Sequence, residues 1–153
     1  MKTFYWSLRG DTAQYSKSAA LRETRNAFNV LNEQLAGAVQ FLESTSLSQV
    51  DHDRITILFS PHPEFPIAVA RHREIVDGVH ELLFDPRARW NIGFWRSLLN
   101  SKHDYRTYLF HEIGHTLGLD HGGPGIMSPF ALFPQRKLDD GEVKEFIDAA
   151  NNI

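Results

Sequence analysis

The sequence predicts an α+β domain with one sheet. Its 153 residues are about the length of one domain, and strand and helix patterns alternate along it. The order is strand, helix, several strands, helix, coil, helix, with period-2 and period-3.6 spacing of apolar residues in the respective segments. Residues 1–153 are therefore expected to form a single domain.

Five segments have the composition of β-strands. Residues 54–60 give the strongest pattern, because they are β-branched and apolar on both faces, which is typical of a central strand. Residues 66–71 begin with Pro66, and a proline at the start of a strand suits an edge position. The complete set of predicted strands is 2–8, 38–43, 54–60, 66–71 and 79–84.

Three segments have helical spacing. The first begins after Ser16 or Ser18, ends near residue 36, and is followed by Gly37 as a stop signal. The second covers about residues 102–117. The third covers 139–150, where Asp139 and Glu142 have the spacing of a capping box.

The second helix carries the motif that predicts function. His111 and His115 are four residues apart, so they project from one face of the helix, one turn apart, and can hold one zinc ion. Gly118 allows a sharp turn that can bring His121 to the same ion. Three protein ligands leave a fourth position for water, whose proton Glu112 can accept.

The rest of this helix supports the metal hypothesis over the alternative of histidines on a solvated face. The required glycine and third histidine reduce the chance frequency of the motif to about 1 in 10,000. Apolar residues on the opposite side can bury the helix against the sheet: Leu109, Phe110, Ile113 and Leu117.

The segment His111–His121 resembles the metzincin zinc signature, and Met127 is the counterpart of the methionine in the family's Met-turn. Within the metzincins the chain is most similar to the matrixins, closely over residues 109–130 and loosely over most of its length. The resemblance implies a twisted five-stranded mixed sheet with an active-site helix, a Met-turn and a C-terminal helix. It also implies an upper part of about residues 1–118 and a lower part of residues 119–153.

The resemblance further implies a substrate that lies extended along the edge strand at 66–71, in a pocket lined by Pro129 and Phe130. Matrixins usually have Pro-x-Tyr after the Met-turn, whereas Phe130 directly follows Pro129 here, which changes the shape of the pocket. No tyrosine follows Met127, so the additional tyrosine ligand of some relatives is absent.

A second metal site is a further hypothesis. His62, Glu64, His72 and His80 resemble the ligand order of the matrixin structural zinc, but their spacings are shorter and favour the alternative of scattered surface residues. Calcium is a further hypothesis, with three carboxylates as candidate ligands: Asp77, Glu81 and Asp85.

Composition and charge limit the partners. The net charge of −3 does not favour nucleic acid or an anionic membrane as a partner, and the lack of cysteine excludes disulfides and thiolate metal sites. Met1–Gly10 contains no apolar run of signal-peptide length, which leaves a cytoplasmic protein or a mature secreted form. We expect a monomer that binds protein or peptide substrates and a proteinaceous inhibitor.

The predicted function is that of a zinc-dependent endopeptidase, with a zinc-activated water and Glu112 as general base and acid. Two alternatives remain open from the sequence. One is a zinc-containing binding or toxin-like module with vestigial proteolysis. The other is a zinc amide hydrolase that acts on a non-peptide substrate.

Overall fold

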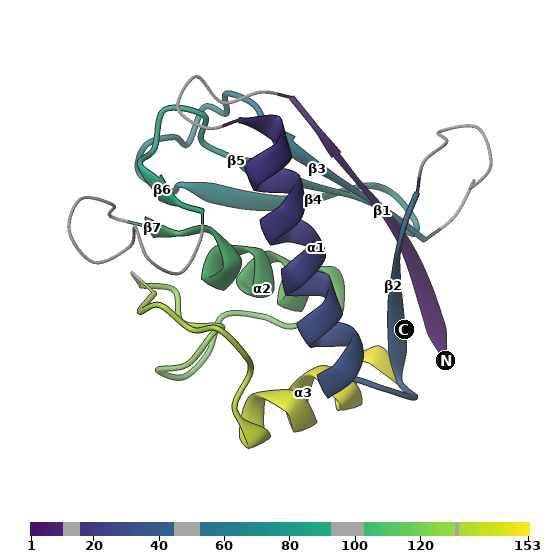
Figure 1. Cartoon of the computed structure of the whole chain (residues 1–153). Coiled ribbons are helices and arrows are strands. Elements are labelled where there is room, and N and C mark those ends of the chain that lie inside the picture. Colours follow the sequence, from purple (N-terminus) through teal and green to yellow (C-terminus); the bar gives the residue numbers. More distant parts are fainter. Residues whose placement is uncertain (11–15, 45–52, 93–102, 131) are drawn as a thin grey trace.

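Five strands form a twisted mixed sheet in the order β2-β1-β3-β5-β4 (Figure 1). The structure is a computed structural model that describes residues 1–10, 16–44, 53–92, 103–130 and 132–153. Neighbouring strands run parallel except at the β4 edge, where β4 pairs antiparallel with β5. The bounds are β1 Lys2–Arg9, β2 Val39–Glu43, β3 Arg54–Phe59, β4 Ala70–Val76 and β5 Val79–Phe84.

The central position predicted for residues 54–60 is confirmed by β3, which lies between β1 and β5. Ile55 and Ile57 on this strand are fully buried. Their β-branched side chains fit the covered face of a pleated sheet, whereas Arg54 and Leu58 on the other face are only partly buried, so the expectation of two apolar faces is met on one face alone.

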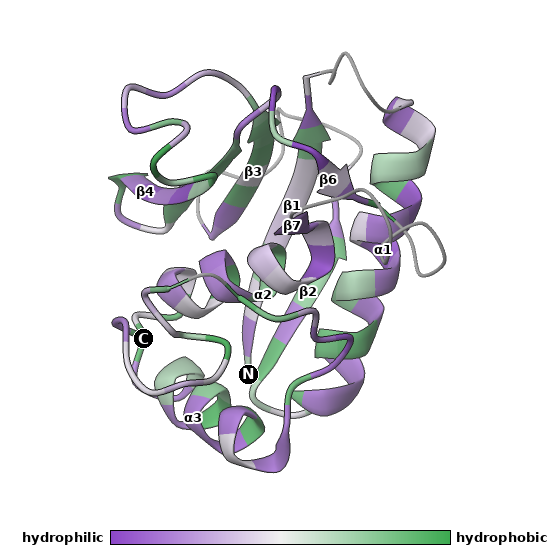
Figure 2. Cartoon of the chain, turned by 90° about the vertical axis from the view of Figure 1, so that its left-hand side faces the viewer, coloured by the Kyte–Doolittle hydropathy of each residue, from purple (hydrophilic) through white to green (hydrophobic). Residues whose placement is uncertain are grey.

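The described residues form three helices, α1 (Lys17–Gln34), α2 (Tyr105–Thr116) and α3 (Asp140–Ala150), of which α1 and α2 contact the sheet. In both overall views α2 lies between the sheet and α3 (Figures 1 and 2). Ser16 caps α1 by accepting a hydrogen bond from the N–H of Ala19 at 3.2 Å. The capping box predicted from Asp139 and Glu142 is present at the start of α3.

Aromatic side chains join the two large helices to the sheet. Phe28 of α1 lies 4.8 Å from Trp6 and 5.1 Å from Phe41, measured between ring centroids. Tyr105 at the start of α2 lies 5.1 Å from Phe84 in the same way. These buried contacts fix α2 against the sheet, and so they fix the direction of its opposite face.

A buried ion network also holds the first turn of α2. The carboxylate of Glu23 on α1 lies 2.6 Å from the Arg106 guanidinium and 2.8 Å from that of Arg136. Arg136 also pairs with Asp104 at 3.1 Å. The network therefore connects α1, the start of α2 and the segment that precedes α3.

The strand predicted at residues 66–71 is wrong in its bounds, although its edge position is confirmed. Residues 63–67 form turns, and the edge strand β4 begins at Ala70. β4 and β5 form a hairpin in which Val76 faces Val79 across Asp77 and Gly78. Gly78 has a φ of 74°, which glycine adopts at little cost, so the Asp-Gly turn rather than the proline sets the register.

The prediction of one sheet is also corrected. Two short parallel strands, β6 (Trp90–Asn91) and β7 (His103–Asp104), form a second, two-stranded sheet. Helix α2 was predicted from residue 102, which lies outside the described residues with the rest of 93–102. The helix begins at Tyr105 because the carboxylate of Asp104 caps it, accepting from the N–H of Thr107 at 3.1 Å.

Among the described helices, none is both long and apolar enough to cross a membrane. The division into upper and lower parts at residue 118 stays a prediction.

Candidate metal centre and active site

Helix α2 has an apolar back and a polar front. Leu109, Phe110 and Ile113 are fully buried against the core, as predicted. The front carries His111 and His115 one turn apart, because each residue of a helix turns about 100°. Packing of the back therefore directs both imidazoles to the same side.

His121 reaches these histidines because the chain turns sharply after α2. Gly118 has a φ of 91°, in the left-handed region that glycine adopts without a steric penalty. The N–H of Leu119 then donates to the carbonyl of Gly114 at 2.9 Å, which closes the end of the helix. The predicted role of Gly118 as a turn is therefore confirmed.

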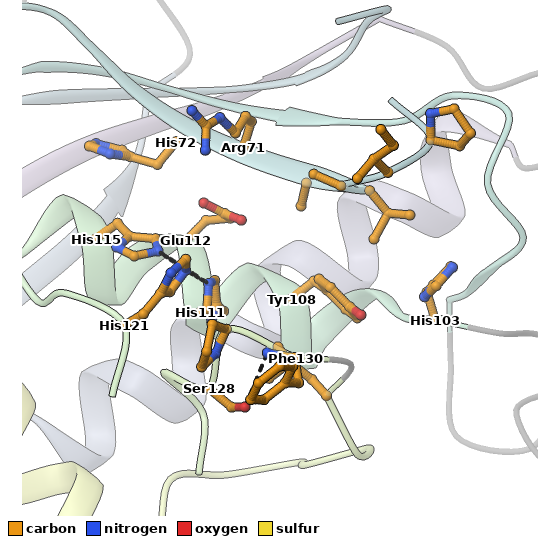
Figure 3. A pocket seen from close by; sticks show the side chains of 17 residues that line it. Arg71, His72, His103, Tyr108, His111, Glu112, His115, His121, Ser128 and Phe130 are labelled. Atoms are coloured by element: carbon orange, nitrogen blue, oxygen red, sulfur yellow. Dashed lines mark hydrogen bonds between the residues drawn. The ribbon is translucent and has the colours of Figure 1, made fainter. Parts of the chain in front are cut away.

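The three histidines form a compact group of nitrogen atoms (Figure 3). Nε2 of His115 lies 3.1 Å from Nε2 of His111 and 3.1 Å from Nε2 of His121, and the third separation is 3.2 Å. A tetrahedral zinc ion with bonds of about 2.0–2.1 Å separates its ligands by about 3.3–3.4 Å. The nitrogen atoms therefore fit one zinc ion with little adjustment.

Backbone carbonyls orient two of the rings. His111 Nδ1 lies 2.6 Å from the carbonyl oxygen of Ile126, and His115 Nδ1 lies 2.7 Å from that of Leu119. Since a carbonyl can only accept, each Nδ1 donates and each Nε2 keeps its lone pair for a metal. Burial lowers the pKa of His111 to about 4 and also lowers the pKa of His115, which favours the neutral rings that bind metal.

Glu112 lies beside the histidines and its side chain is buried. Burial raises its pKa to about 8, while the Arg71 guanidinium and the backbone N–H of His72 act in the opposite direction. A nearby dication also favours the carboxylate. The residue is thus a buried carboxyl group whose proton affinity depends on the charges around it.

A cleft of about 450 Å³ contains this group of side chains. Arg71 and His72 of β4 lie on one side, above His115 and Glu112, and Tyr108 extends toward the other end of the cleft (Figure 3). The edge strand and α2 therefore form opposite walls of the cleft. The imidazole rings of the three histidines lie in the space between these walls.

Comparison with known families identifies this arrangement. The family model of the matrixins matches residues 1–143. The chain belongs to the matrixin family. None of the curated proteins compared with the chain matches it. Matrixins are metalloendopeptidases with a catalytic zinc, so the chain is a zinc metalloendopeptidase whose substrates are peptides or proteins.

In this matrixin Met127 packs directly against the metal-binding helix. It is buried in a tight turn, where the N–H of Ser128 donates to the carbonyl of Gly125 at 3.0 Å. The position of a Cβ at Gly114 would overlap with the Met127 sulfur atom. The sulfur therefore lies where only a glycine between His111 and His115 leaves room for it.

Replacing Gly114 by alanine is expected to destabilise the matrixin fold. The new Cβ would also lie 3.1 Å from atoms of Met127 and Phe146, and overpacking of this kind costs about 1–3 kcal/mol. Alanine recovers about 1 kcal/mol of helix propensity, so a net loss is expected. Thermal unfolding measures it, with Gly122→Ala as the control because no atom lies within 4 Å of a Cβ there. A melting temperature of Gly114→Ala at or above that of the unaltered protein would contradict the packing.

Pro129 and Phe130 both line the cleft. The N–H of Phe130 donates to Ser128 Oγ at 3.2 Å, and the phenyl ring is 81% exposed. An exposed ring beside a cleft can cover a bound side chain. The role of both residues as the wall of a substrate pocket stays a prediction.

The second zinc site predicted from four side chains is not assembled. His72 Nε2 and His80 Nδ1 are 2.9 Å apart, but His62 Nδ1 accepts from the N–H of Glu64, whose carboxylate pairs with Arg71 at 2.8 Å. In the described part of the chain, the zinc-site histidines are the only group of three or more metal-ligating side chains. His62 and Glu64 lie in the turns before β4, so the geometry favours the alternative of scattered residues over a second zinc site.

The calcium site predicted from three carboxylates is likewise not assembled. Glu81 accepts from the Arg73 guanidinium at 2.6 Å, and Asp85 is buried and accepts from the N–H of Arg87 at 2.9 Å. Asp77 lies in the hairpin turn. Two of the three carboxylates therefore have partners of their own within the protein.

Two side chains of the cleft were not predicted from the sequence. Arg71 is the only lysine or arginine among the described residues that line the cleft. Tyr108 lies four residues before Glu112 on α2, and burial raises the pKa of its phenol. Helical spacing could have indicated Tyr108, whereas Arg71 depends on the true start of β4.

Metal-free protein is expected to be most stable near neutral pH. Burial lowers the pKa values of His72 and His111 to about 4 and those of His80 and His115 below their usual value, whereas it raises that of Glu112 to about 8. As pH falls from about 6.5 to 4, the unfolded chain binds more protons at the histidines, so stability is lost. As pH rises from about 4.5 through 8, the contribution of protonated Glu112 is lost.

Thermal unfolding in the presence of a chelator, at about pH 5, 6.5 and 8.5, measures this balance. Because four histidines oppose one glutamate, the melting temperature should be highest at the middle value. Glu112→Gln should remove the decline on the alkaline side. A melting temperature that is highest at the acidic value would contradict the burial of the histidines.

Proposed function

We propose that this matrixin hydrolyses internal peptide bonds at a zinc ion held by His111, His115 and His121, with Glu112 as general base and then general acid. The observation that supports the proposal most strongly is the triangle of Nε2 atoms directly beside a buried carboxyl group. When bound, zinc supplies Lewis-acid chemistry, which polarises a carbonyl and lowers the pKa of water to about 7.

Glu112 moves the proton in this proposal. Its carboxylate accepts a proton from the attacking water and passes it to the amine that leaves, so that one new carboxyl and one new amino terminus result. The Arg71 guanidinium and the N–H of His72 both favour the carboxylate form that must accept the proton. Burial excludes bulk water, which strengthens these interactions.

The substrate is proposed to bind as an added strand along β4. Within the described residues β4 pairs only with β5, so its outer edge is available. The backbone N–H of His72 favours the carboxylate form of Glu112, which supports a binding segment at the start of β4. The binding segment is thus proposed at Ala70–His72, and the side chain that follows the reacting bond would contact Pro129 and Phe130.

Cleavage of a mixed peptide library by the zinc-loaded protein tests this function, with Glu112→Gln run beside it and mass spectrometry as the readout. Internal cuts that require Glu112 would support an endopeptidase. Release of an amine only from small non-peptide amides would instead support an amide hydrolase. Binding of peptides without any cleavage by the zinc-loaded protein would contradict the proposal and support a binding module.

A further inference from the structure

Glu142 is a buried carboxylate on the first turn of α3, outside the cleft. It is 7% exposed, and its carboxylate accepts hydrogen bonds from three N–H groups of the described residues. The N–H of Ile126 donates to Oε1 at 2.7 Å and the N–H of Asp139 to Oε2 at 2.8 Å. The side-chain amide of Gln135 also donates to Oε2. The capping box explains the bond from Asp139 but not the bond from Ile126.

The bond from Ile126 connects Glu142 to the metal centre. Ile126 is buried, its N–H donates to Glu142, and its carbonyl accepts from His111 Nδ1 at 2.6 Å. One residue therefore joins a carboxylate of α3 to the ring of a zinc ligand. A shift of Ile126 would change the direction of the carbonyl that orients His111.

The two oriented histidines differ in what holds their carbonyl partners. Leu119, the partner of His115, is held by a backbone hydrogen bond from its own N–H to the carbonyl of Gly114. Ile126, the partner of His111, has its N–H bonded to a side chain from another element. The orientation of His111 can therefore be changed by a single side-chain substitution outside the cleft.

Gly125 is independent support for the close approach of Glu142 to this turn. A Cβ at Gly125 would lie 2.6 Å from Glu142 Oε1, closer than real Cβ atoms come to an oxygen. The residue before Ile126 must therefore lack a side chain if the carboxylate is to reach the Ile126 N–H. The hydrogen bond between Glu142 and Ile126 therefore depends on the glycine at position 125.

We infer that Glu142 is a positioning residue for the zinc ligand His111 and acts through the backbone of Ile126. The inference rests on the proposed role of His111 as a zinc ligand. Loss of the carboxylate leaves the buried N–H of Ile126 without its acceptor, so the turn moves and the ring of His111 loses its fixed orientation. Zinc affinity should fall even though Glu142 does not contact the metal.

The test measures the zinc dissociation constant of the folded protein by competition with a chelator. Glu142→Ala and Glu142→Met both remove the acceptor, and methionine also fills the space, so it serves if the alanine variant does not fold. Both should weaken zinc binding by about 10-fold, the lower end of the range for residues that orient metal ligands. The absorption bands of the cobalt-substituted protein should shift as well, because they report ligand geometry.

Asp139→Ala is the matched control. It removes the N-cap side chain of α3 but leaves every hydrogen bond that Glu142 accepts. It should lower the melting temperature and leave zinc affinity and the cobalt spectrum unchanged. Unchanged zinc affinity in both Glu142 variants, or an equal loss in Asp139→Ala, would overturn the inference. Absence of zinc binding by the unaltered protein would instead refute the proposed site, and zinc binding without cleavage would refute only the proposed function.

Discussion

Replacing Glu112 by glutamine is expected to lower peptide-hydrolysis turnover by about 100- to 10,000-fold, the usual contribution of a positioned general base. Glutamine has nearly the same shape, so the side chain should still fit its buried site. It cannot accept a proton from water or deliver one to the leaving amine. The proposed zinc ligands are the three clustered histidines and do not include Glu112, so the variant should still bind zinc.

Turnover of an internally quenched peptide and the zinc content of the same samples measure this effect. Glu145→Gln is the control, since it makes the same chemical change at an exposed position of α3. If Glu112→Gln turned over the peptide as fast as Glu145→Gln, the result would contradict the proposed mechanism. Loss of zinc together with turnover would show that Glu112 acts on the metal site rather than on the proton.

Replacing His121 by alanine is expected to weaken zinc binding by more than about 100-fold and to abolish turnover, because a direct ligand contributes more than the residues that orient it. His121 is exposed and follows α2, so the fold of the helix should be retained. The two remaining nitrogen atoms, 3.1 Å apart, would have to hold the ion alone.

Competition with a chelator measures the affinity, and circular dichroism checks the fold. His62→Ala is the matched control, because this histidine lies in the turns before β4 and does not join the cluster of three. It should leave zinc affinity unchanged. Tight binding of one zinc ion by His121→Ala, or a comparable loss in His62→Ala, would contradict the assignment of the ligands.

The metal-binding helix could be predicted from the sequence because its geometry is local. The spacing of His111 and His115 fixes their common face once a helix forms, and Gly118 marks the turn toward His121. The structure brings these side chains together as expected. Local capping signals were equally informative at Asp139, where the predicted capping box is present.

Features that depend on distant partners could not be predicted in this way. The start of β4 is set by its pairing with β5 across Asp77 and Gly78, so a strand placed from Pro66 was wrong. The same pairing separates the residues of the hypothetical second zinc site, since His62 lies in the turns while His72 lies on the strand. The hydrogen bond from the N–H of Ile126 to the carboxylate of Glu142 joins residues that are 16 positions apart, outside any local pattern.

The measurement that tests the central claim most directly is a zinc titration of metal-free protein, followed by hydrolysis of an internally quenched peptide. The site of three histidines predicts no turnover without zinc, a linear rise as zinc is added, and a plateau at one ion per chain. Full turnover in the metal-free protein, or a plateau reached only at two ions per chain, would contradict a single catalytic zinc held by His111, His115 and His121.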